Sequence, residues 1–315
     1  MIEPYRWTLG EYVLRCEQGA DLCEVLVESD IDRDVFGDAL KRWRAEHVRV
    51  LASDYIEVSD DETRRAGFNL GVKGRLLTVA TALESSVAIG GARVTIIVDR
   101  DYDDVLAPGD TLLTTDGHSL ENYAFSAAAL DRFARVVLGR GPLPAGAGNQ
   151  PASHRVTCTG ADLYRRVAPA ATDIAAVRLT LLGLEEPPRV FKRWPDYVSA
   201  STDGVLSVNR RTLLRNVLDR AGRGNEYASL EPCLEVEAGR VTTDTFRLVR
   251  GHDFVSLLLK LLRTRWGRRV AGNRLISAQE GALARLLLVC VDPAHLDATP
   301  LFAELQRRFC RGAAP

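Results

Sequence analysis

Apolar positions in the first half of the chain form short runs that are separated by longer, periodic segments. The runs span residues 22–27, 48–52, 94–98 and 111–115. Short, continuous apolar runs of this kind are typical of strands buried in a parallel sheet. Between them, helical spacing of apolar residues predicts helices over 32–46 and 74–89. Strands that alternate with helices indicate an α/β domain whose Rossmann-like parallel sheet is covered by helices on both faces.

Helical spacing dominates the second half of the chain. It recurs over residues 126–138, 162–184, 212–221, 253–266, 278–291 and 301–309. The segment 139–153 is rich in Gly, Pro and small residues, as linkers and long loops are. We therefore expect an α/β domain over residues 1–140, a linker or long loop over 141–153 and a mainly helical domain over 154–315.

Composition places the chain among globular proteins that do not enter membranes. Hydrophobic residues make up 46% and charged residues 26% of its 315 residues, and no apolar run is long enough to span a bilayer. The N-terminus lacks the basic-then-apolar pattern of a signal peptide. The six cysteines are scattered, without zinc-site spacing or a CxxC pair. We expect a cytoplasmic protein with neither structural zinc nor disulfides.

The net charge of −1 conceals an asymmetry between the two halves of the chain. Residues 1–150 carry 16 Lys and Arg against 25 Asp and Glu, a net of −9, whereas residues 151–315 carry 25 against 17, a net of +8. This difference fits an acidic, metal-holding half joined to a basic half that faces a polyanion. Attraction between the halves, or to a protein partner, explains it about equally well.

Acidic residues crowd at the ends of two predicted strands. Asp99, Asp101, Asp103 and Asp104 follow the run 94–98, and Glu28 follows the run 22–27. The C-terminal ends of parallel strands meet at one edge of a sheet, and alternate strand residues point to the same side. We therefore expect Glu28, Asp99 and Asp101 to converge there. Converging carboxylates suit a hard cation such as Mg²⁺.

Four blocks in this part of the chain resemble one family. LVESDIDRDVF, NLGVKGRL, VTIIVDRDYDD and TTDGHSLENY, in this order, resemble the TOPRIM-like nuclease family that includes the effector of the PARIS phage-defence system. A fifth block, VRGHDFVSLL over 249–258, resembles a segment of that family's second half. The resemblance covers residues 20–125 well and the remainder loosely, and it implies a TOPRIM fold for the α/β domain.

The resemblance also implies roles for individual residues. Glu28 would be the general acid/base and share in metal binding, while Asp99 and Asp101 would be the Mg²⁺ ligands, with Mn²⁺ as a substitute. Asp103 would assist them, and Glu121 would be a further acidic residue of the catalytic site. Where the family usually has glycine after the first glutamate, this chain has Ser29, whose side chain can bond the nearby backbone.

The function implied by the resemblance is metal-dependent cleavage of phosphodiester bonds by a toxic anti-phage effector. RNA, tRNA in particular, is the favoured substrate and DNA the second. Such nucleases are often controlled by an ATPase partner, and this chain has no GxxxxGK[ST] loop of its own, so the ATPase would be a separate protein. Effectors of this type commonly form homodimers.

Basic residues suggest where nucleic acid would bind. Lys73 and Arg75 begin a predicted helix, where backbone N–H groups also attract phosphate. The densest basic run surrounds Trp266, and an aromatic among arginines suits stacked bases and paired phosphates. This run comprises Arg263, Arg265, Arg268 and Arg269, and a smaller one comprises Arg210, Arg211 and Arg215. A solvated helix face explains the same residues almost as well.

Two other functions compete with the nuclease. A non-catalytic TOPRIM-like adaptor could bind or sense an ATPase, although such a subunit need not keep four carboxylates. A glycosyltransferase also holds metal and nucleotide-sugar with a DxD motif, but it gives no role to Glu28 or to Glu121. His252 and Asp253 open a predicted helix, and we expect Asp253 to be its N-cap.

Overall fold

The structure is a computed structural model that describes residues 6–19, 21–86, 93–102, 110–139, 158–188, 194–271, 275 and 277–310. The expected linker over 141–153 and Asp103 lie outside these residues. Contacts divide the chain into two compact units. Unit 1 comprises Met1–Asp116 and Pro293–Pro315, and unit 2 comprises Gly117–Asp292.

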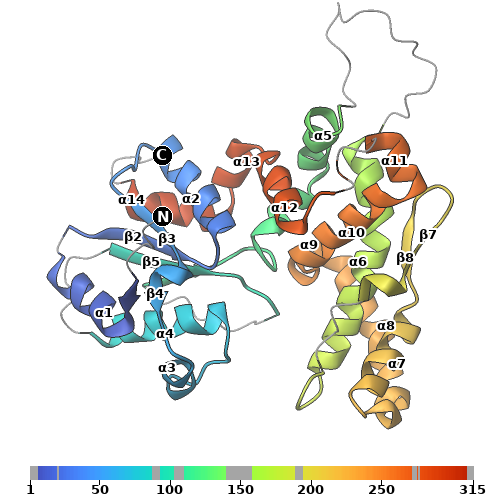
Figure 1. Ribbon diagram of the computed structural model, residues 1–315, viewed down its shortest axis with the longest axis horizontal. Coiled ribbons are helices and arrows are strands. Elements are labelled where there is room, and N and C mark those ends of the chain that lie inside the picture. Colours follow the sequence, from blue (N-terminus) through green and yellow to red (C-terminus); the bar gives the residue numbers. More distant parts are fainter. Residues whose placement is uncertain are drawn as a thin grey trace, which may run out of the picture. The chain divides into compact units, whose positions relative to one another are not determined.

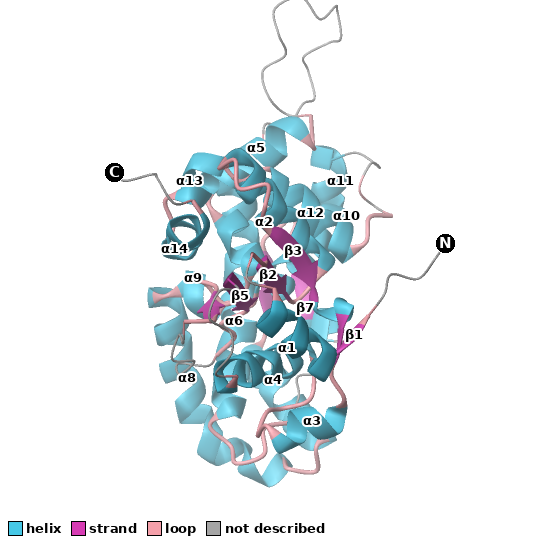
Figure 2. Ribbon diagram, turned by 90° about the vertical axis from the view of Figure 1, so that its left-hand side faces the viewer, coloured by secondary structure: helices cyan, strands magenta, loops and turns pink. Residues whose placement is uncertain are grey.

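Unit 1 is an α/β unit built on a four-stranded parallel sheet (Figures 1 and 2). Its strands are β2 (Cys23–Val27), β3 (Arg49–Ala52), β5 (Arg93–Val98) and β6 (Leu112–Thr114), in the order β3-β2-β5-β6. The structure thus confirms the α/β class and the parallel sheet that the apolar runs predicted. A second, two-stranded parallel sheet pairs β1 (Trp7–Thr8) with β4 (Ile56–Glu57).

Helices cover both faces of the unit 1 sheet (Figure 1). The helices of unit 1 are α1 (Leu9–Gln18), α2 (Asp30–Arg42), α3 (Asp60–Arg65), α4 (Val72–Ser85), α13 (Pro293–Asp297) and α14 (Pro300–Phe309). On one face, α1 and α4 contribute Tyr12 and Leu76 to a core that includes Leu26 and Ile96 of the sheet. On the other face lie α2 and α14, and hydrophobic burial on both sides holds the four strands together.

The C-terminal helices belong to unit 1 because they pack against α2 and the sheet. The Phe36 and Phe302 rings stack with centroids 5.2 Å apart, and Arg42 pairs with Asp297 at 2.9 Å. This division differs from the one expected from the sequence, which assigned residues 154–315 to a single domain. It also places α5 (Ala127–Val136) in unit 2, beyond the start of that unit at Gly117.

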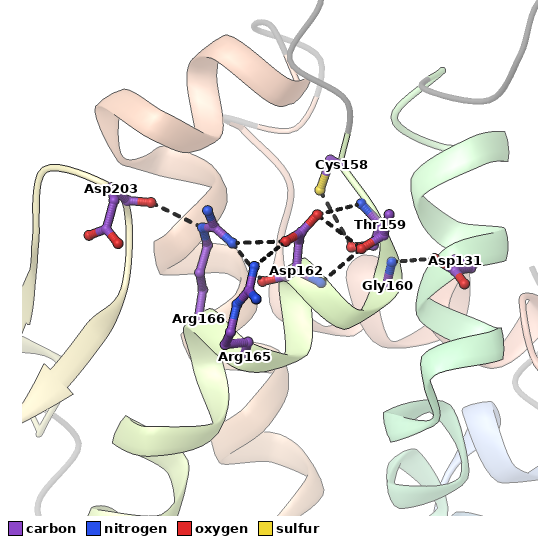
Figure 3. A network of polar contacts seen from close by, with 8 residues as sticks. All are labelled: Asp131, Cys158, Thr159, Gly160, Asp162, Arg165, Arg166 and Asp203. Carbon is purple, nitrogen blue, oxygen red and sulfur yellow. Dashed lines mark hydrogen bonds and ion pairs between the residues drawn. The ribbon is translucent and has the colours of Figure 1, made fainter.

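Unit 2 is mainly helical and is organised around the long helix α6 (Gly160–Leu182), which packs against α5, α7 (Arg210–Arg220), α8 (Tyr227–Thr243) and α10 (Gly251–Arg263). The remaining elements are η2 (Leu120–Phe125), η4 (Trp194–Tyr197), η5 (Gly224–Glu226), α9 (Thr245–Leu248), α11 (Arg265–Ala271), α12 (Glu280–Val289) and the antiparallel strands β7 (Val198–Ala200) and β8 (Leu206–Val208). A capping box formed by Thr159 and Asp162 starts α6, and the Gly160 N–H donates to Asp131 of α5 (Figure 3).

One predicted helix is divided in two. The sequence predicts a single helix over 253–266, whereas α10 ends at Arg263 and α11 begins at Arg265. Thr264 has extended backbone (φ −67°, ψ 168°), and its Oγ1 accepts the Gly267 N–H at 3.1 Å. This side-chain acceptor starts a new helix in the way that an N-cap residue does. Within the described ranges, no helix is both long and apolar enough to cross a membrane.

Candidate functional site

The carboxyl ends of β2 and β5 bring Glu28 and Asp99 together. The two strands are parallel neighbours, with Leu26 opposite Ile96. Glu28 follows the last residue of β2, and Asp99 follows the last residue of β5. The Glu28 Oε1 accepts the backbone N–H of Asp99 at 2.8 Å. Two residues that are 71 positions apart in the sequence thus share one edge of the sheet.

The turn after Glu28 is fixed by a helix cap. Ser29 is the N-cap of α2: its Oγ accepts the Asp32 N–H at 3.3 Å, and Asp32 Oδ2 accepts the Ser29 N–H at 2.9 Å. Ser29 has extended backbone with φ −139°, a conformation that does not require glycine. The Glu28 carbonyl also accepts the Ser53 hydroxyl at 2.9 Å. The serine at this position therefore holds Glu28 by its own hydrogen bonds.

Asp101 is held by Lys73 in an unusual backbone conformation. Its φ is +54°, in the left-handed region that residues other than Gly, Asn and Asp seldom adopt. Lys73, in the first turn of α4, places its Nζ 3.1 Å from Asp101 Oδ2 and 3.1 Å from the Arg100 carbonyl oxygen. Because β5 ends at Val98, the strand alternation expected to align Asp99 with Asp101 does not extend to Asp101.

The environment of Glu28 favours a carboxyl group that exchanges protons near neutral pH. Burial raises the pKa of Glu28 to about 7, and the hydrogen bond from the Asp99 N–H opposes this rise. The charges of Asp101 and Asp32 raise the pKa further, whereas the Lys73 ammonium lowers it. A group whose pKa lies near the working pH is suited to general acid/base catalysis. We call Glu28, Asp99, Asp101 and Lys73 the sheet-edge cluster.

The donors of the sheet-edge cluster match a hard cation in kind. Carboxylate oxygens are the ligands that Mg²⁺ prefers. In the part of the chain that the structure describes, however, no group of three or more acidic, His or Cys side chains is arranged to hold a metal ion. At Asp101, the Lys73 ammonium lies beside the carboxylate. A cation binding at Asp101 would have to compete with this ammonium.

Glu121 belongs to unit 2, whereas Glu28, Asp99 and Asp101 belong to unit 1. Glu121 is buried in η2, where its Oε2 accepts the Ser119 hydroxyl at 2.8 Å. Its Oε1 lies 3.2 Å from Nδ1 of His252, an imidazole that is 60% exposed.

Two of the sequence blocks that carry the resemblance pack against each other within unit 2. The Asn122 amide donates to the carbonyls of Phe246 and Val249 at 2.7 and 2.9 Å, and its Oδ1 accepts the Ser119 N–H at 3.1 Å. A Cβ on Gly251 would lie 2.8 Å from the Glu121 Cβ, so the two blocks approach closely because residue 251 is glycine. We call Ser119, Glu121, Asn122 and His252 the Glu121 cluster.

The sequence predicted that Asp253 is the N-cap of α10, and this prediction is wrong. The N-cap of α10 is Arg250, without a side-chain capping bond. Asp253 is buried in the first turn and pairs with Arg178 of α6 through two hydrogen bonds, 2.7 and 3.0 Å long. The pairing could not be read from spacing, since the partners are 75 residues apart.

The predicted nucleic-acid-binding residues fall into three environments. Lys73 pairs with Asp101, and Arg75 lies 4.0 Å from Asp60. The arginines of the run around Trp266 are all exposed, at the end of α10 and on α11. The Trp266 ring, by contrast, is buried to 9% exposure beneath the Arg166 guanidinium, which lies 4.3 Å from the ring centroid. Stacking of bases on Trp266, expected from the sequence, therefore does not fit its burial.

Two arginines of the smaller basic run form ion pairs within unit 2, and the third lies over an aromatic ring. Arg210 pairs with Asp173 at 2.9 Å and with Glu235. Arg211 lies 3.3 Å from Glu231 and from Glu235. Arg215 lies over the Tyr227 ring, 4.4 Å from its centroid. These arginines stabilise the contact between α7 and α8.

Comparison with known proteins adds no family to this description. No family model matches the sequence, and no curated protein matches it.

Proposed function

We propose that the chain is a metal-dependent nuclease of the TOPRIM type that cleaves phosphodiester bonds in nucleic acid. The observation that carries the proposal is the position of Glu28: its pKa is raised to about 7, and it accepts the Asp99 N–H at the edge of a parallel sheet. Ligand sites of such sheets lie at this edge. The proposed substrate is RNA, tRNA in particular, with DNA second.

Each residue of the sheet-edge cluster has a distinct role in this proposal. Asp99 and Asp101 would hold Mg²⁺, or Mn²⁺ as a substitute, together with Glu28 and with Asp103, which lies outside the described residues. The bound cation would supply positive charge that stabilises the negative charge developing on the phosphate. Glu28 moves protons: in its protonated form it donates to the leaving oxygen, and as the carboxylate it accepts a proton from the attacking hydroxyl or water.

Lys73 supports the site by holding Asp101. Its ammonium donates to the Asp101 carboxylate and to the carbonyl oxygen of the preceding residue, Arg100. This pairing keeps the loop after β5 in place and partly neutralises its acidic charge. The wider proposal, a toxic anti-phage effector controlled by a separate ATPase, rests on the sequence resemblance alone.

The same Lys73–Asp101 contact favours a second candidate, the non-catalytic adaptor. An ammonium that permanently occupies the position of a cation would leave a folded but inactive acidic cluster. This reading gives the cluster a structural role and predicts that it binds no divalent cation.

A cleavage and metal-binding experiment separates the two. Purified full-length protein is incubated with total tRNA or plasmid DNA, in Mg²⁺ or in EDTA. We expect Mg²⁺-dependent cleavage that falls by about 100-fold or more in Glu28→Gln and Asp99→Asn, the range for loss of a general acid/base or an electrostatic stabiliser. The matched control is Asp21→Asn, an exposed carboxylate in the same unit.

A second readout, thermal stability against Mg²⁺ concentration, is independent of cleavage. Mg²⁺ should raise the melting temperature of the wild type but not of Asp99→Asn, because ligands stabilise the state that binds them. Lys73→Met should respond at lower Mg²⁺, since the competing ammonium is gone. Equal melting temperatures at all Mg²⁺ concentrations, together with no cleavage, would leave the adaptor as the better description.

A further inference from the structure

Three carboxylates are buried in the part of the chain that the structure describes, and only two of them are held by arginine. These two, Glu24 and Asp253, each accept two hydrogen bonds from one guanidinium group. The third, Glu121, has the Ser119 hydroxyl and the His252 imidazole as partners, and neither is a permanent cation. Because buried charges are normally paired or bound to metal, Glu121 requires either a proton on His252 or another cation.

The separation of Glu121 and His252 matches that of two ligands of one metal ion. Glu121 Oε1 and His252 Nδ1 are 3.2 Å apart. At the usual ligand distance of about 2.1 Å, these two atoms would subtend an angle of about 100° at the ion. This angle lies between those of octahedral and tetrahedral coordination. The same separation suits an ion pair in which the imidazole is protonated, so a proton and a metal ion would compete for one position.

The surroundings of the pair hold both side chains in place. The Ser119 hydroxyl donates to Glu121 Oε2 at 2.8 Å, and Oε1 faces His252. A Cβ on Gly251 would lie 2.8 Å from the Glu121 Cβ, so the backbone that leads into His252 lies close to the carboxylate. The next residue, Asp253, is buried and paired with an arginine, which anchors the first turn of α10. Hydrogen bonds of this kind to the outer atoms of ligands are typical of metal sites.

We propose that Glu121 and His252 bind a divalent transition metal ion such as Zn²⁺. An imidazole nitrogen beside a carboxylate oxygen favours Zn²⁺ or Co²⁺ over Mg²⁺, which prefers oxygen ligands throughout. Within the described ranges, no third acidic, His or Cys side chain completes the site. Because the His252 side chain is 60% exposed, water or an anionic group of a ligand, such as a phosphate, would fill the remaining positions. The site is therefore open, unlike a structural zinc site with four protein ligands.

The test is metal binding by the full-length protein, freed of metal with EDTA and then dialysed. Isothermal titration calorimetry measures Kd for Zn²⁺, Co²⁺ and Mg²⁺. Every protein in the series carries Asp99→Asn, which removes a proposed ligand of the sheet-edge cluster, and Cys233→Ser, which removes an exposed thiol. The test variants are His252→Ala and Glu121→Gln. The matched control, His295→Ala, removes another exposed imidazole.

We expect a site that binds Zn²⁺ with a Kd at least about tenfold lower than that for Mg²⁺. Loss of an outer partner of a metal ligand costs about 10- to 100-fold in affinity, and Ser119→Ala should raise the Kd for Zn²⁺ within that range. His252→Ala and Glu121→Gln remove a ligand itself and should raise the Kd by about 100-fold or more. His295→Ala should leave the Kd unchanged. Circular dichroism confirms that each variant is folded, and the visible absorption of bound Co²⁺ reports the loss of the imidazole ligand.

Several results would overturn the inference. An unchanged Kd for Zn²⁺ in His252→Ala, or equal losses in His252→Ala and His295→Ala, would show that the ion binds elsewhere. No binding of Zn²⁺, or equal Kd for Zn²⁺ and Mg²⁺, would leave Glu121 and His252 as an ion pair alone. Zinc binding that is lost in both test variants supports the inference whether or not the protein cleaves nucleic acid, so its outcome is independent of the proposed nuclease.

Discussion

The sheet-edge cluster of unit 1 and the Glu121 cluster of unit 2 are both acidic, but the environments of their carboxylates differ. At the sheet edge, Glu28 carries a pKa raised to about 7, and Asp101 adopts a left-handed backbone. In the Glu121 cluster, the carboxylate is matched by Ser119 and His252, and the neighbouring Asp253 is matched by Arg178.

The conformation and burial of the sheet-edge cluster lower the stability of the fold, whereas the paired groups around Glu121 raise it. Backbone strain and a half-buried, poorly neutralised carboxylate cost stability and tend to occur at functional sites. A buried network whose groups are all paired rigidifies the fold, and breaking it is costly. We therefore expect substitutions at the Glu121 region to destabilise the protein and removal of the Glu28 charge to stabilise it.

The largest effect should follow from breaking the buried pair beside the Glu121 cluster. Arg178→Met leaves the buried Asp253 carboxylate without its bidentate partner. The expected loss is about 3–5 kcal/mol of the free energy of unfolding, measured by urea denaturation with hydrogen exchange of α6 and α10. Arg178→Met combined with Asp253→Leu should recover much of the loss. A loss below about 1 kcal/mol, as for an exposed pair, would contradict the assigned burial.

Glu28→Gln should act in the opposite direction, and only above acidic pH. The folded-state pKa of about 7 exceeds the ordinary value of 4.5, so the folded state binds more protons than the unfolded state between these values. Wild-type stability therefore falls as pH rises from about 4.5 to about 7 and stays low above it. Gln retains an oxygen for the Asp99 N–H without this cost.

The measurement is the free energy of unfolding of the wild type and of Glu28→Gln in EDTA, at several pH values. We expect Glu28→Gln to be more stable by about 1–3 kcal/mol at pH near 8, with the difference vanishing near pH 4. A difference that is the same at both pH values would mean that the charge of Glu28 is not the cause. Such a result would remove the physical basis for its acid/base role.

The smallest effects test how closely the two blocks of the Glu121 cluster approach. Gly251→Ala places a methyl group against Ser119 and Glu121, and such overpacking costs about 1–3 kcal/mol. Gly239→Ala, in α8 with no atom within 4 Å of the added Cβ, is the matched control. It should stabilise by about 0.5–1 kcal/mol through helix propensity. Thermal denaturation that moves both variants in the same direction would contradict the close approach at Gly251.

The sequence predicted those features that can be recognised from the residues of one short segment. All four strands of the main sheet and two of the helices between them, α2 and α4, follow from apolar runs and helical spacing. The placement of Glu28 and Asp99 at strand ends follows from the same pattern. Helices α1, α3 and α8 and the short strands β1, β4, β7 and β8 were not predicted. In α1, Tyr12 and Cys16 are buried, and the Tyr12 hydroxyl and Arg15 bind the buried Glu24 of β2, a cluster without a sequence motif.

What the sequence by itself determined is therefore the α/β alternation, the helical second half and the order of acidic residues along the chain. Only the tertiary structure decided that β2 pairs with β5, that Lys73 holds Asp101, that Trp266 is buried under Arg166 and that α14 returns to unit 1. The periodicity of apolar residues indicates which face of a helix or strand is buried, and it is a property of residues that are close together in the sequence. It does not record the partner, because burial of apolar area is non-directional and the choice among partners depends on packing of segments far apart in the chain.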